Sequence, residues 1–246
     1  VDECQDECKK FVKEYGITVI GGAGNARRSL SNWDVETDLC SYPTENYPYK
    51  QRFLVDDKII FRADNETNRH KPLAGSMPAV VDAVQGADAV LLSDYDKGFL
   101  TQDTIYSIAV MCKRRDIPCV ADAKRDPKFY RGATLKCNAD YTNKYEKWWE
   151  RHDYQYVQTL GANTPVFRFS EQYDETGYVR YKLPPVKCVN HVGAGDCFSA
   201  HLTLALAYGF SLEDAATIAH SAGRVYVQHP HNRPPQPHEI KDDLAQ

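Results

Sequence analysis

A short run near the end of the chain combines glycines with a carboxylate in a pattern suited to phosphate chemistry. Gly193, Ala194 and Gly195 precede Asp196, and helical periodicity follows from Phe198 onward. The free N–H groups of a first helical turn bind anions, and glycine lets the anion approach the backbone closely. A carboxylate placed there can accept the proton of an attacking hydroxyl, as phosphoryl transfer to an alcohol requires.

Asp196 also has a purely structural interpretation. Aspartate is a favoured helix N-cap, and Gly-x-Gly-Asp is common in turns. The run lacks both the third glycine of a dinucleotide fingerprint and the Lys-Ser/Thr of a P-loop, so neither of those phosphate sites is indicated. The fragment alone leaves a catalytic base and a helix cap as alternatives.

A second glycine run follows a β-branched segment at residues 17–20. Gly21, Gly22 and Asn25 open into a short helix predicted to end near Trp33. The glycines allow close backbone approach, and an asparagine amide can donate and accept hydrogen bonds with hydroxyl groups. An ordinary strand-to-helix turn is the alternative.

These two runs, in this order, resemble the signatures of the ribokinase-like (PfkB) carbohydrate kinases. The segment VGAGDCFSAHLTLALAYG is similar to the signature near the end of that family. The resemblance implies that Asp196 is the catalytic base, that the amides of residues 193–195 form the anion hole, and that residues 21–25 contact the sugar. It also implies ATP and Mg²⁺ as cofactors.

The resemblance further implies a single ribokinase-like domain over residues 1–246. Its fold would be α/β, with a doubly wound, mostly parallel sheet flanked by helices. A small β lid is expected from about residues 8–20 and 47–64, and lid strands of this family often join two subunits into a homodimer. Connections such as residues 30–48 are shorter than the family usually has, so either the chain is a compact member or connecting segments are missing from the sequence.

Residues 49–64 predict a hairpin around the polar turn at residues 56–57. The pattern resembles the heptose-phosphate kinase branch of the family, with Arg52, Arg62 and Asp64 at the matching positions. Two arginines would suit a sugar that already carries a phosphate, because the guanidinium fork matches phosphate oxygens. The alternative is a lid hairpin with solvated charges.

A buried strand predicted at residues 87–92 ends in a polar loop, residues 93–98, that again resembles this branch. Open α/β sheets bind ligands at the carboxyl ends of their strands. The resemblance implies substrate contacts by Asp94 and Lys97, against the alternative of a purely structural turn.

The nucleotide site is implied by matches later in the chain. Thr159 and Gly161 match the Thr-x-Gly of the family, and Asn138 is the best counterpart of its Pro-Asn-x-x-Glu motif. The glutamate has no unambiguous counterpart, which leaves the metal ligands unknown. Ala219 and Gly223 are small enough to face an adenine ring, although small residues also serve plain helix packing.

The first residues contain two carboxylates that match an acidic pair lining the family's sugar site. Asp2 and Asp6 have the right spacing, but Val1 stands where a glycine is expected and the preceding strand is absent. A frayed acidic terminus is the alternative.

The rest of the chain alternates predicted helices and strands, which indicates a mostly parallel sheet. Thr101 is expected to cap a helix over residues 102–114, and Ser211 a last helix ending near Val227. Strands are expected at residues 117–121 and 156–159, with a hairpin at 166–169 and 178–181. Residues 229–238 are expected to form a connector with exposed histidines.

Composition describes an ordinary soluble protein with a net charge of −4, so neither nucleic acid nor a membrane is an expected partner. The eight cysteines include no C-x-x-C pair, which argues against zinc and for reduced thiols in a cytoplasmic protein. No signal peptide or long apolar run is present.

The expected activity is transfer of the γ-phosphoryl group of ATP to a hydroxyl of a sugar or sugar phosphate. The closest resemblance implies the anomeric hydroxyl of a heptose 7-phosphate. The alternatives are another ribokinase-like sugar or nucleoside kinase, and a catalytically weak binding protein.

Overall fold

The computed structural model describes residues 22–40, 49–55, 58–65, 77–149, 155–161, 163–168, 179–180 and 184–246. The expected strand at residues 17–20, the lid segment 8–20 and the predicted site residues Asp2, Asp6 and Gly21 lie outside the described residues.

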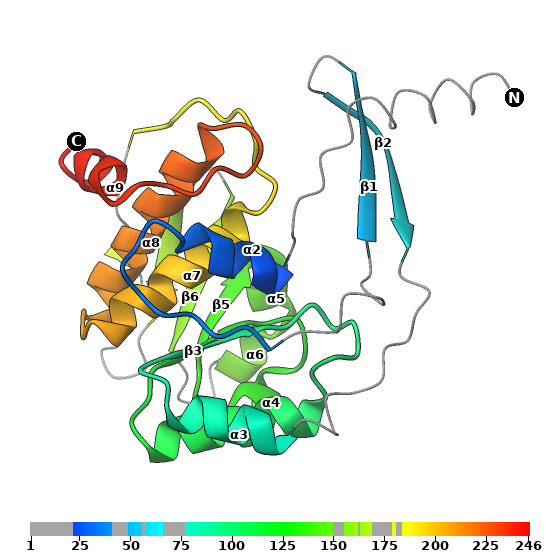
Figure 1. Cartoon of the computed structure of the whole chain (residues 1–246), viewed down its shortest axis with the longest axis vertical. Coiled ribbons are helices and arrows are strands. Elements are labelled where there is room, and N and C mark those ends of the chain that lie inside the picture. The colour runs from blue at the N-terminus through cyan, green and yellow to red at the C-terminus, as the bar shows by residue number, and fades with distance from the viewer. Residues whose placement is uncertain are drawn as a thin grey trace, which may run out of the picture.

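A six-stranded sheet forms the centre of the molecule (Figure 1). Its strands follow one another across the sheet in chain order: β3 (Val90–Ser93), β4 (Cys119–Asp122), β5 (Thr134–Asn138), β6 (Tyr156–Leu160), β7 (Asn163–Arg168) and β8 (Val179–Arg180). The first four are parallel, and β7 and β8 are antiparallel to their neighbours. The carboxyl ends of β3 to β6 therefore meet at one edge, where a ligand is expected.

Helices cover both faces of this sheet, as predicted. In chain order they are α2 (Gly22–Ser29), α3 (Met77–Gln85), α4 (Gln102–Arg114), the 3-10 helix η3 (Pro127–Tyr130), α5 (Ala139–Lys144), α6 (Glu146–Trp149), α7 (Ala194–Ala207), α8 (Leu212–Val227) and α9 (Pro237–Leu244). In Figure 1, α3 and α4 lie on one side of the sheet and α7 and α8 on the other.

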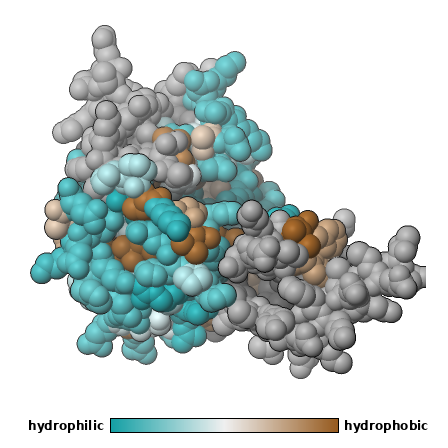
Figure 2. Space-filling view, turned by 90° about the horizontal axis from the view of Figure 1, so that it is seen from above, coloured by the Kyte–Doolittle hydropathy of each residue, from teal (hydrophilic) through white to brown (hydrophobic). Residues whose placement is uncertain are grey.

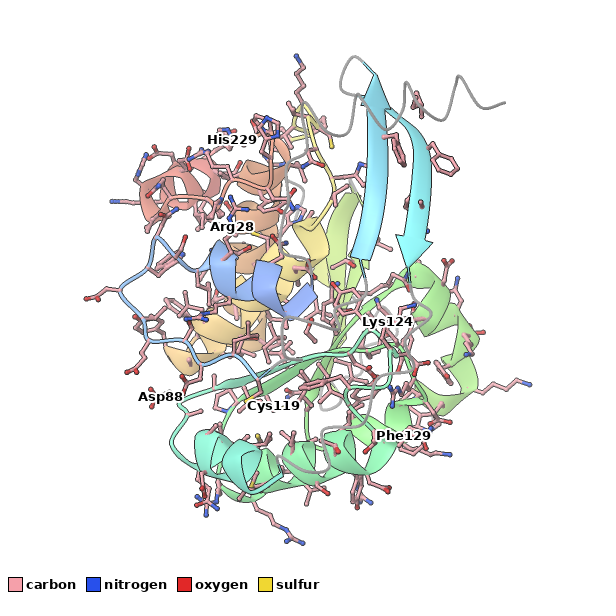
Figure 3. The ribbon with its side chains drawn as sticks, turned by 45° about the vertical axis from the view of Figure 1, so that its right-hand side comes forward. Arg28, Asp88, Cys119, Lys124, Phe129 and His229 are labelled. Carbon is pink, nitrogen blue, oxygen red and sulfur yellow. The ribbon has the colours of Figure 1, made fainter. Side chains whose placement is uncertain are left out.

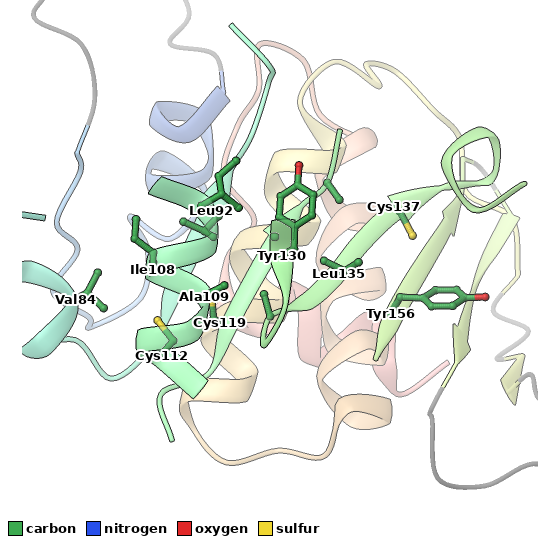
Figure 4. Packing of buried hydrophobic residues seen from close by; sticks show 14 of the residues in the cluster. Val84, Leu92, Ile108, Ala109, Cys112, Cys119, Tyr130, Leu135, Cys137 and Tyr156 are labelled. Carbon is green, nitrogen blue, oxygen red and sulfur yellow. The ribbon is translucent and has the colours of Figure 1, made fainter. Parts of the chain in front are cut away.

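The two faces of the sheet bury separate hydrophobic clusters because successive strand residues point to opposite sides. On β4, Cys119 and Ala121 join the cluster under α4, which Figure 4 shows, whereas Val120 packs against α7 and α8. β6 divides in the same way between Tyr156 and Val157. The predicted α/β fold with a mostly parallel, helix-flanked sheet is confirmed.

Helix ends follow the capping signals of the sequence. The Oγ atoms of Thr101 and Ser211 each accept a backbone N–H three residues later, at 3.1 Å, and both helices end as predicted. α2 stops at Ser29, and hydrogen-bonded turns continue the segment to Trp33.

The expected connector at residues 229–238 is wrong in part, because α9 begins at Pro237. Its capping box pairs Gln236 with Glu239, and proline is favoured in the first turn of a helix. His229 is half-buried and lies 3.5 Å from Glu239 Oε1, whereas His231 and His238 are exposed. The expectation of exposed histidines therefore fails for His229 alone.

The predicted hairpin is confirmed as a separate two-stranded sheet, β1 (Tyr49–Val55) and β2 (Lys58–Asn65), which stands beside the body in Figure 1. Its register pairs Arg52 with Arg62, and the rings of Phe53 and Phe61 lie 5.4 Å apart between centroids.

The cysteines within the described part of the chain are all free thiols. None of the described helices combines the length and the apolar character needed to span a bilayer.

Candidate active site

Asp196 lies in the first turn of α7 and its residue is only 8% exposed. The turn begins at Gly193, whose φ of 87° is in the left-handed region that favours glycine. A Cβ at Gly193 would overlap Asn25 Nδ2 and lie 2.5 Å from the hydroxyl oxygen of Tyr226. Only glycine therefore fits between these side chains.

Two side chains from distant segments hold the Asp196 carboxylate. Asn25 on α2 donates from Nδ2 to Oδ2 at 3.0 Å, and the hydroxyl of Tyr95, in the loop after β3, donates to Oδ1. Tyr226 on α8 donates to the carbonyl oxygen of Val192 at 3.1 Å. The predicted pair of glycine runs thus meets at one point, with Asn25 against Asp196.

Burial raises the pKa of Asp196 above its ordinary value of 3.8, and the hydrogen bonds from Tyr95 and Asn25 partly oppose that rise. Burial also raises the pKa of Tyr95 far above its ordinary range, so the phenol stays a neutral donor. A carboxylate with a raised pKa is a stronger proton acceptor than an ordinary aspartate.

The amides of this turn differ from the predicted anion hole at one position. The N–H of Ala194 donates to the carbonyl oxygen of His191 at 3.2 Å, so it is already engaged. Within the described residues, the N–H groups of Gly193, Gly195 and Asp196 have no acceptor. These three, rather than the amides of residues 193–195, are the donors that an anion would meet.

Asp94 is fully buried and has other partners than a substrate. The hydroxyl of Tyr130 donates to its Oδ2 at 2.6 Å, and Arg125 Nε lies 3.2 Å from the same oxygen. Arg125 also pairs with Asp96 at 2.9 Å, so Asp94 holds the loop after β3 in place. The structural alternative fits its position, and its predicted sugar contact gains no support.

The same loop carries Lys97, which is half-buried. It also presents the Tyr95 ring to Gly22 at the start of α2, where an added Cβ would lie 3.2 Å from the ring. Gly22 also has a φ of 57°, so both the backbone conformation and the nearby ring favour glycine at this position.

The hairpin arginines are not brought to Asp196 by any contact among the described residues. Arg62 is exposed, and its Nε lies 3.0 Å from Asp64 Oδ1 on the same strand. Arg52 faces Arg62 in the strand register, and its side chain lies outside the described part of the structure. Their predicted role at the substrate stays a prediction.

Three predicted nucleotide residues do converge. Asn138, Thr159 and Gly161 line an open pocket of about 380 Å³ at the carboxyl ends of β5 and β6. Asn138 Oδ1 accepts the N–H of Tyr141 at 2.9 Å and so caps α5, and Thr159 Oγ1 donates to Cys137 O at 3.2 Å.

The two predicted adenine contacts on α8 do not line this pocket. Ala219 is fully buried in the cluster beneath α7, so helix packing explains its small size. Gly223 is half-buried, and a Cβ there would meet nothing within 4 Å.

Among the described residues, no three His, Cys, Asp or Glu side chains gather in a way that could hold a metal ion. Mg²⁺ in phosphoryl-transfer sites is held largely by substrate phosphates and one or two carboxylates, so a preformed cluster is not required.

The sequence did not predict three residues of this site. Tyr95, Tyr226 and Lys136 reach the start of α7 from three different elements, and Lys136 Nζ lies 3.0 Å from where a Cβ of Gly195 would be. Tyr95 stands in a loop that the sequence singled out, so its place after a strand was a usable signal. Tyr226 and Lys136 gave none, because both act across long sequence separations.

The chain is similar in sequence to known carbohydrate kinases. Residues 129–239 match the pfkB family carbohydrate kinase profile. The bifunctional protein HldE of Nitratiruptor sp. is 28% identical over 248 residues, covering 85% of this chain and 53% of the relative. The HldE of Koribacter versatilis is also 28% identical, covering 93% and 51%. The chain spans about half the length of these relatives.

Solved structures share the fold. A carbohydrate kinase from Agrobacterium tumefaciens superposes with a TM-score of 0.65 at 18% identity, covering 94% of this chain and 90% of that one. A ribokinase from Arabidopsis thaliana, solved with ribose and ATP, gives a TM-score of 0.57 at 18% identity over 68% and 59%. Residues 129–239 of this chain are therefore similar to the pfkB family carbohydrate kinases, and its fold is ribokinase-like.

Proposed function

We propose that this protein transfers the γ-phosphoryl group of ATP to a hydroxyl of a sugar or sugar phosphate. The observation that carries the proposal is the buried Asp196 carboxylate in the first turn of α7, beside backbone amides that have no acceptor among the described residues. A proton acceptor and an anion site within one helical turn are the two parts that this chemistry needs. The family match supports the same reaction class.

In the proposed reaction, Asp196 accepts the proton of the sugar hydroxyl while the oxygen of that hydroxyl attacks the γ-phosphorus. A new oxygen–phosphorus bond forms, the bond to the β-phosphate oxygen breaks, and ADP leaves. The hydrogen bond from Asn25 fixes the carboxylate, so that one oxygen can face the attacking hydroxyl. The Tyr95 hydroxyl donates to the other carboxylate oxygen, Oδ1, and has to move away if the substrate hydroxyl binds there.

Negative charge that builds on the phosphoryl oxygens is met by the amides of Gly193, Gly195 and Asp196 and by the positive end of the α7 dipole. The proposed ATP site extends to the pocket of Asn138, Thr159 and Gly161 at the neighbouring strand ends. Mg²⁺, the proposed cofactor, would neutralise further charge on the nucleotide phosphates, and Asn138 is the described residue proposed to help hold it.

For the sugar, we propose a heptose 7-phosphate that is phosphorylated at its anomeric hydroxyl. The support is the resemblance of residues 49–64 and 93–98 to the heptose-phosphate kinase branch, together with the HldE relatives. A different ribokinase-like sugar or nucleoside kinase is the second candidate, favoured by the burial of Asp94 and by the position of Arg62 on its own strand with Asp64. A cytoplasmic homodimer, joined through the β1–β2 hairpin, is part of the same proposal.

The test is an ATP-turnover assay with a panel of sugars, nucleosides and sugar 7-phosphates. The proposal expects one substrate class to stand out, with heptose 7-phosphate as the best substrate. A preference for an unphosphorylated sugar would select the second candidate. Sugar binding without turnover on any member of the panel would identify a binding protein instead and would contradict the proposed activity.

A further inference from the structure

A buried ammonium group lies against the start of α7. Lys136, on β5, has a side chain that is 8% exposed, and its Nζ lies 3.0 Å from Asp122 Oδ2 on β4. The same Nζ lies 3.0 Å from the point that a Cβ of Gly195 would occupy. The missing side chain at Gly195 therefore leaves room for the ammonium beside the first turn.

This is an unfavourable place for a cation that only stabilises the fold. The N-terminal end of a helix carries a partial positive charge, which repels an ammonium and attracts an anion. Burial adds the cost of desolvating the charge, which a partner must offset. Lys136 has such a partner in Asp122, but Lys124 Nζ lies 3.2 Å from the other oxygen of that carboxylate and shares it.

The charge balance changes when the proposed reaction proceeds. In the resting site, the charges of Asp122 and Asp196 together match those of Lys124 and Lys136. Burial raises the pKa of Asp196, and the charge of Lys136 opposes a small part of that rise. Once Asp196 accepts the hydroxyl proton, one negative charge of this group is lost. Lys136 is then left with excess positive charge at the moment when negative charge builds on the phosphoryl oxygens.

From this juxtaposition we infer that Lys136 is a further catalytic residue, whose ammonium donates a hydrogen bond to an oxygen of the transferred phosphoryl group. The inference rests on the proposed kinase activity. Lys136 keeps its proton throughout, and the only proton that moves goes from the sugar hydroxyl to Asp196. A fixed ammonium suits this task because charge-assisted hydrogen bonds to phosphate oxygens are short and strong.

The experiment compares the dissociation constants of ADP and of a non-hydrolysable ATP analogue by calorimetry. Lys136→Met should weaken the analogue about 10- to 100-fold, the usual worth of a charged hydrogen bond, and leave ADP nearly unchanged. Turnover on the best sugar should fall about 10²- to 10³-fold. A role limited to packing would change the affinities for the two nucleotides equally.

Lys124→Met is the matched control, because Lys124 (labelled in Figure 3) contacts the same carboxylate from a more exposed position. It should keep the wild-type ratio of the two dissociation constants. If Lys136→Met does not fold, the double variant Asp122→Asn/Lys136→Met removes both buried charges and should show the same selective loss.

The inference would be overturned if both Lys136 variants kept the wild-type ratio of the two dissociation constants. It would also be overturned if Lys124→Met changed that ratio as much as Lys136→Met does. Neither result would contradict the kinase activity. The opposite outcome is also possible: the selective loss of the ATP analogue in Lys136→Met is found, but the wild-type protein phosphorylates no sugar. That result would support the Lys136 contact and contradict the proposed function. The two failures are therefore distinguishable.

Discussion

At the scale of single residues, the site depends on how the Asp196 carboxylate is held. Its two oxygens accept hydrogen bonds from two neutral donors, Asn25 and Tyr95, and burial keeps its pKa raised. Both donors come from segments far away in sequence, so neither contact could be read from the α7 signature itself.

Asn25→Asp is predicted to move the acidic limb of the pH–rate profile to higher pH. The new carboxylate would stand 3.0 Å from Asp196 in place of a donor, and a like charge disfavours ionisation, so the pKa of Asp196 rises further. Activity needs the ionised base and is lost as the pH falls through that pKa. Profiles of kcat/KM for wild type and variant test this; coinciding acidic limbs would show that Asp196 is not the titrating base.

At the scale of elements, α7 has to begin in a restricted place, between α2 and α8. Gly193→Ala is predicted to destabilise the protein by about 2–4 kcal/mol, because a Cβ would overlap Asn25 and approach Tyr226 in a left-handed conformation. Chemical denaturation measures the loss, and turnover should fall with it.

Gly209, at the other end of α7, provides a matched control. Its φ of 79° carries the same backbone strain, but an added Cβ would meet nothing within 4 Å. Gly209→Ala should cost about 1 kcal/mol and leave activity intact. Equal losses for the two variants would mean that backbone strain, and not the crowding around Asn25, decides the effect.

The β1–β2 hairpin carries the two arginines that are predicted to bind the substrate. If its arginines bind the phosphate of the substrate, Arg52→Ala or Arg62→Ala should weaken a sugar 7-phosphate more than the unphosphorylated sugar, by about 1.5–3 kcal/mol. Measured KM values for the two sugars decide this. Equal losses for both sugars would leave the hairpin only a closing role.

Local signals were enough for most elements. The N-cap residues Thr101 and Ser211 predicted the starts of their helices, and β-branched runs predicted the strands. The glycine runs also predicted that Asn25 and Asp196 serve one site, because two signatures of one family imply a common ligand. What sequence could not supply were contacts decided by packing: Arg125 against Asp94, Lys136 against Gly195, and the engagement of the Ala194 amide by His191.

At the scale of the whole molecule, a buried histidine ties the segment after α2 to the α7 helix. Trp33 Nε1 donates to His201 Nε2 at 3.1 Å, and His201 Nδ1 lies 2.9 Å from Cys197 O. Burial lowers the pKa of His201 from 6.5 to about 4. The folded state therefore needs the neutral ring.

This predicts a loss of stability in mild acid. Between pH 6.5 and about 4, His201 is protonated in the unfolded chain but stays neutral in the folded protein. The free energy of unfolding therefore falls as the pH falls, by roughly 3 kcal/mol in total. Denaturation at several pH values measures the slope. His201→Gln should reduce this slope only in part, because burial also lowers the pKa of His220. His238 is exposed, so His238→Gln should leave the slope unchanged.

Assembly is predicted to involve the hairpin side of the molecule. Ile60 and Phe61 on β2 are 63% and 59% exposed, and Figure 2 shows apolar surface at the end of the molecule where the hairpin stands. Ile60→Lys should convert a hairpin-joined homodimer to monomer in light scattering. An unchanged dimer would place the interface elsewhere.

The central claim is that Asp196 is a base and not merely a helix cap, and Asp196→Asn tests it most directly. The amide keeps the size and most hydrogen bonds but cannot accept the hydroxyl proton. With the best sugar of the panel, we predict turnover reduced about 10²- to 10⁴-fold, with the ATP dissociation constant nearly unchanged. Near-wild-type turnover in this variant would contradict the account.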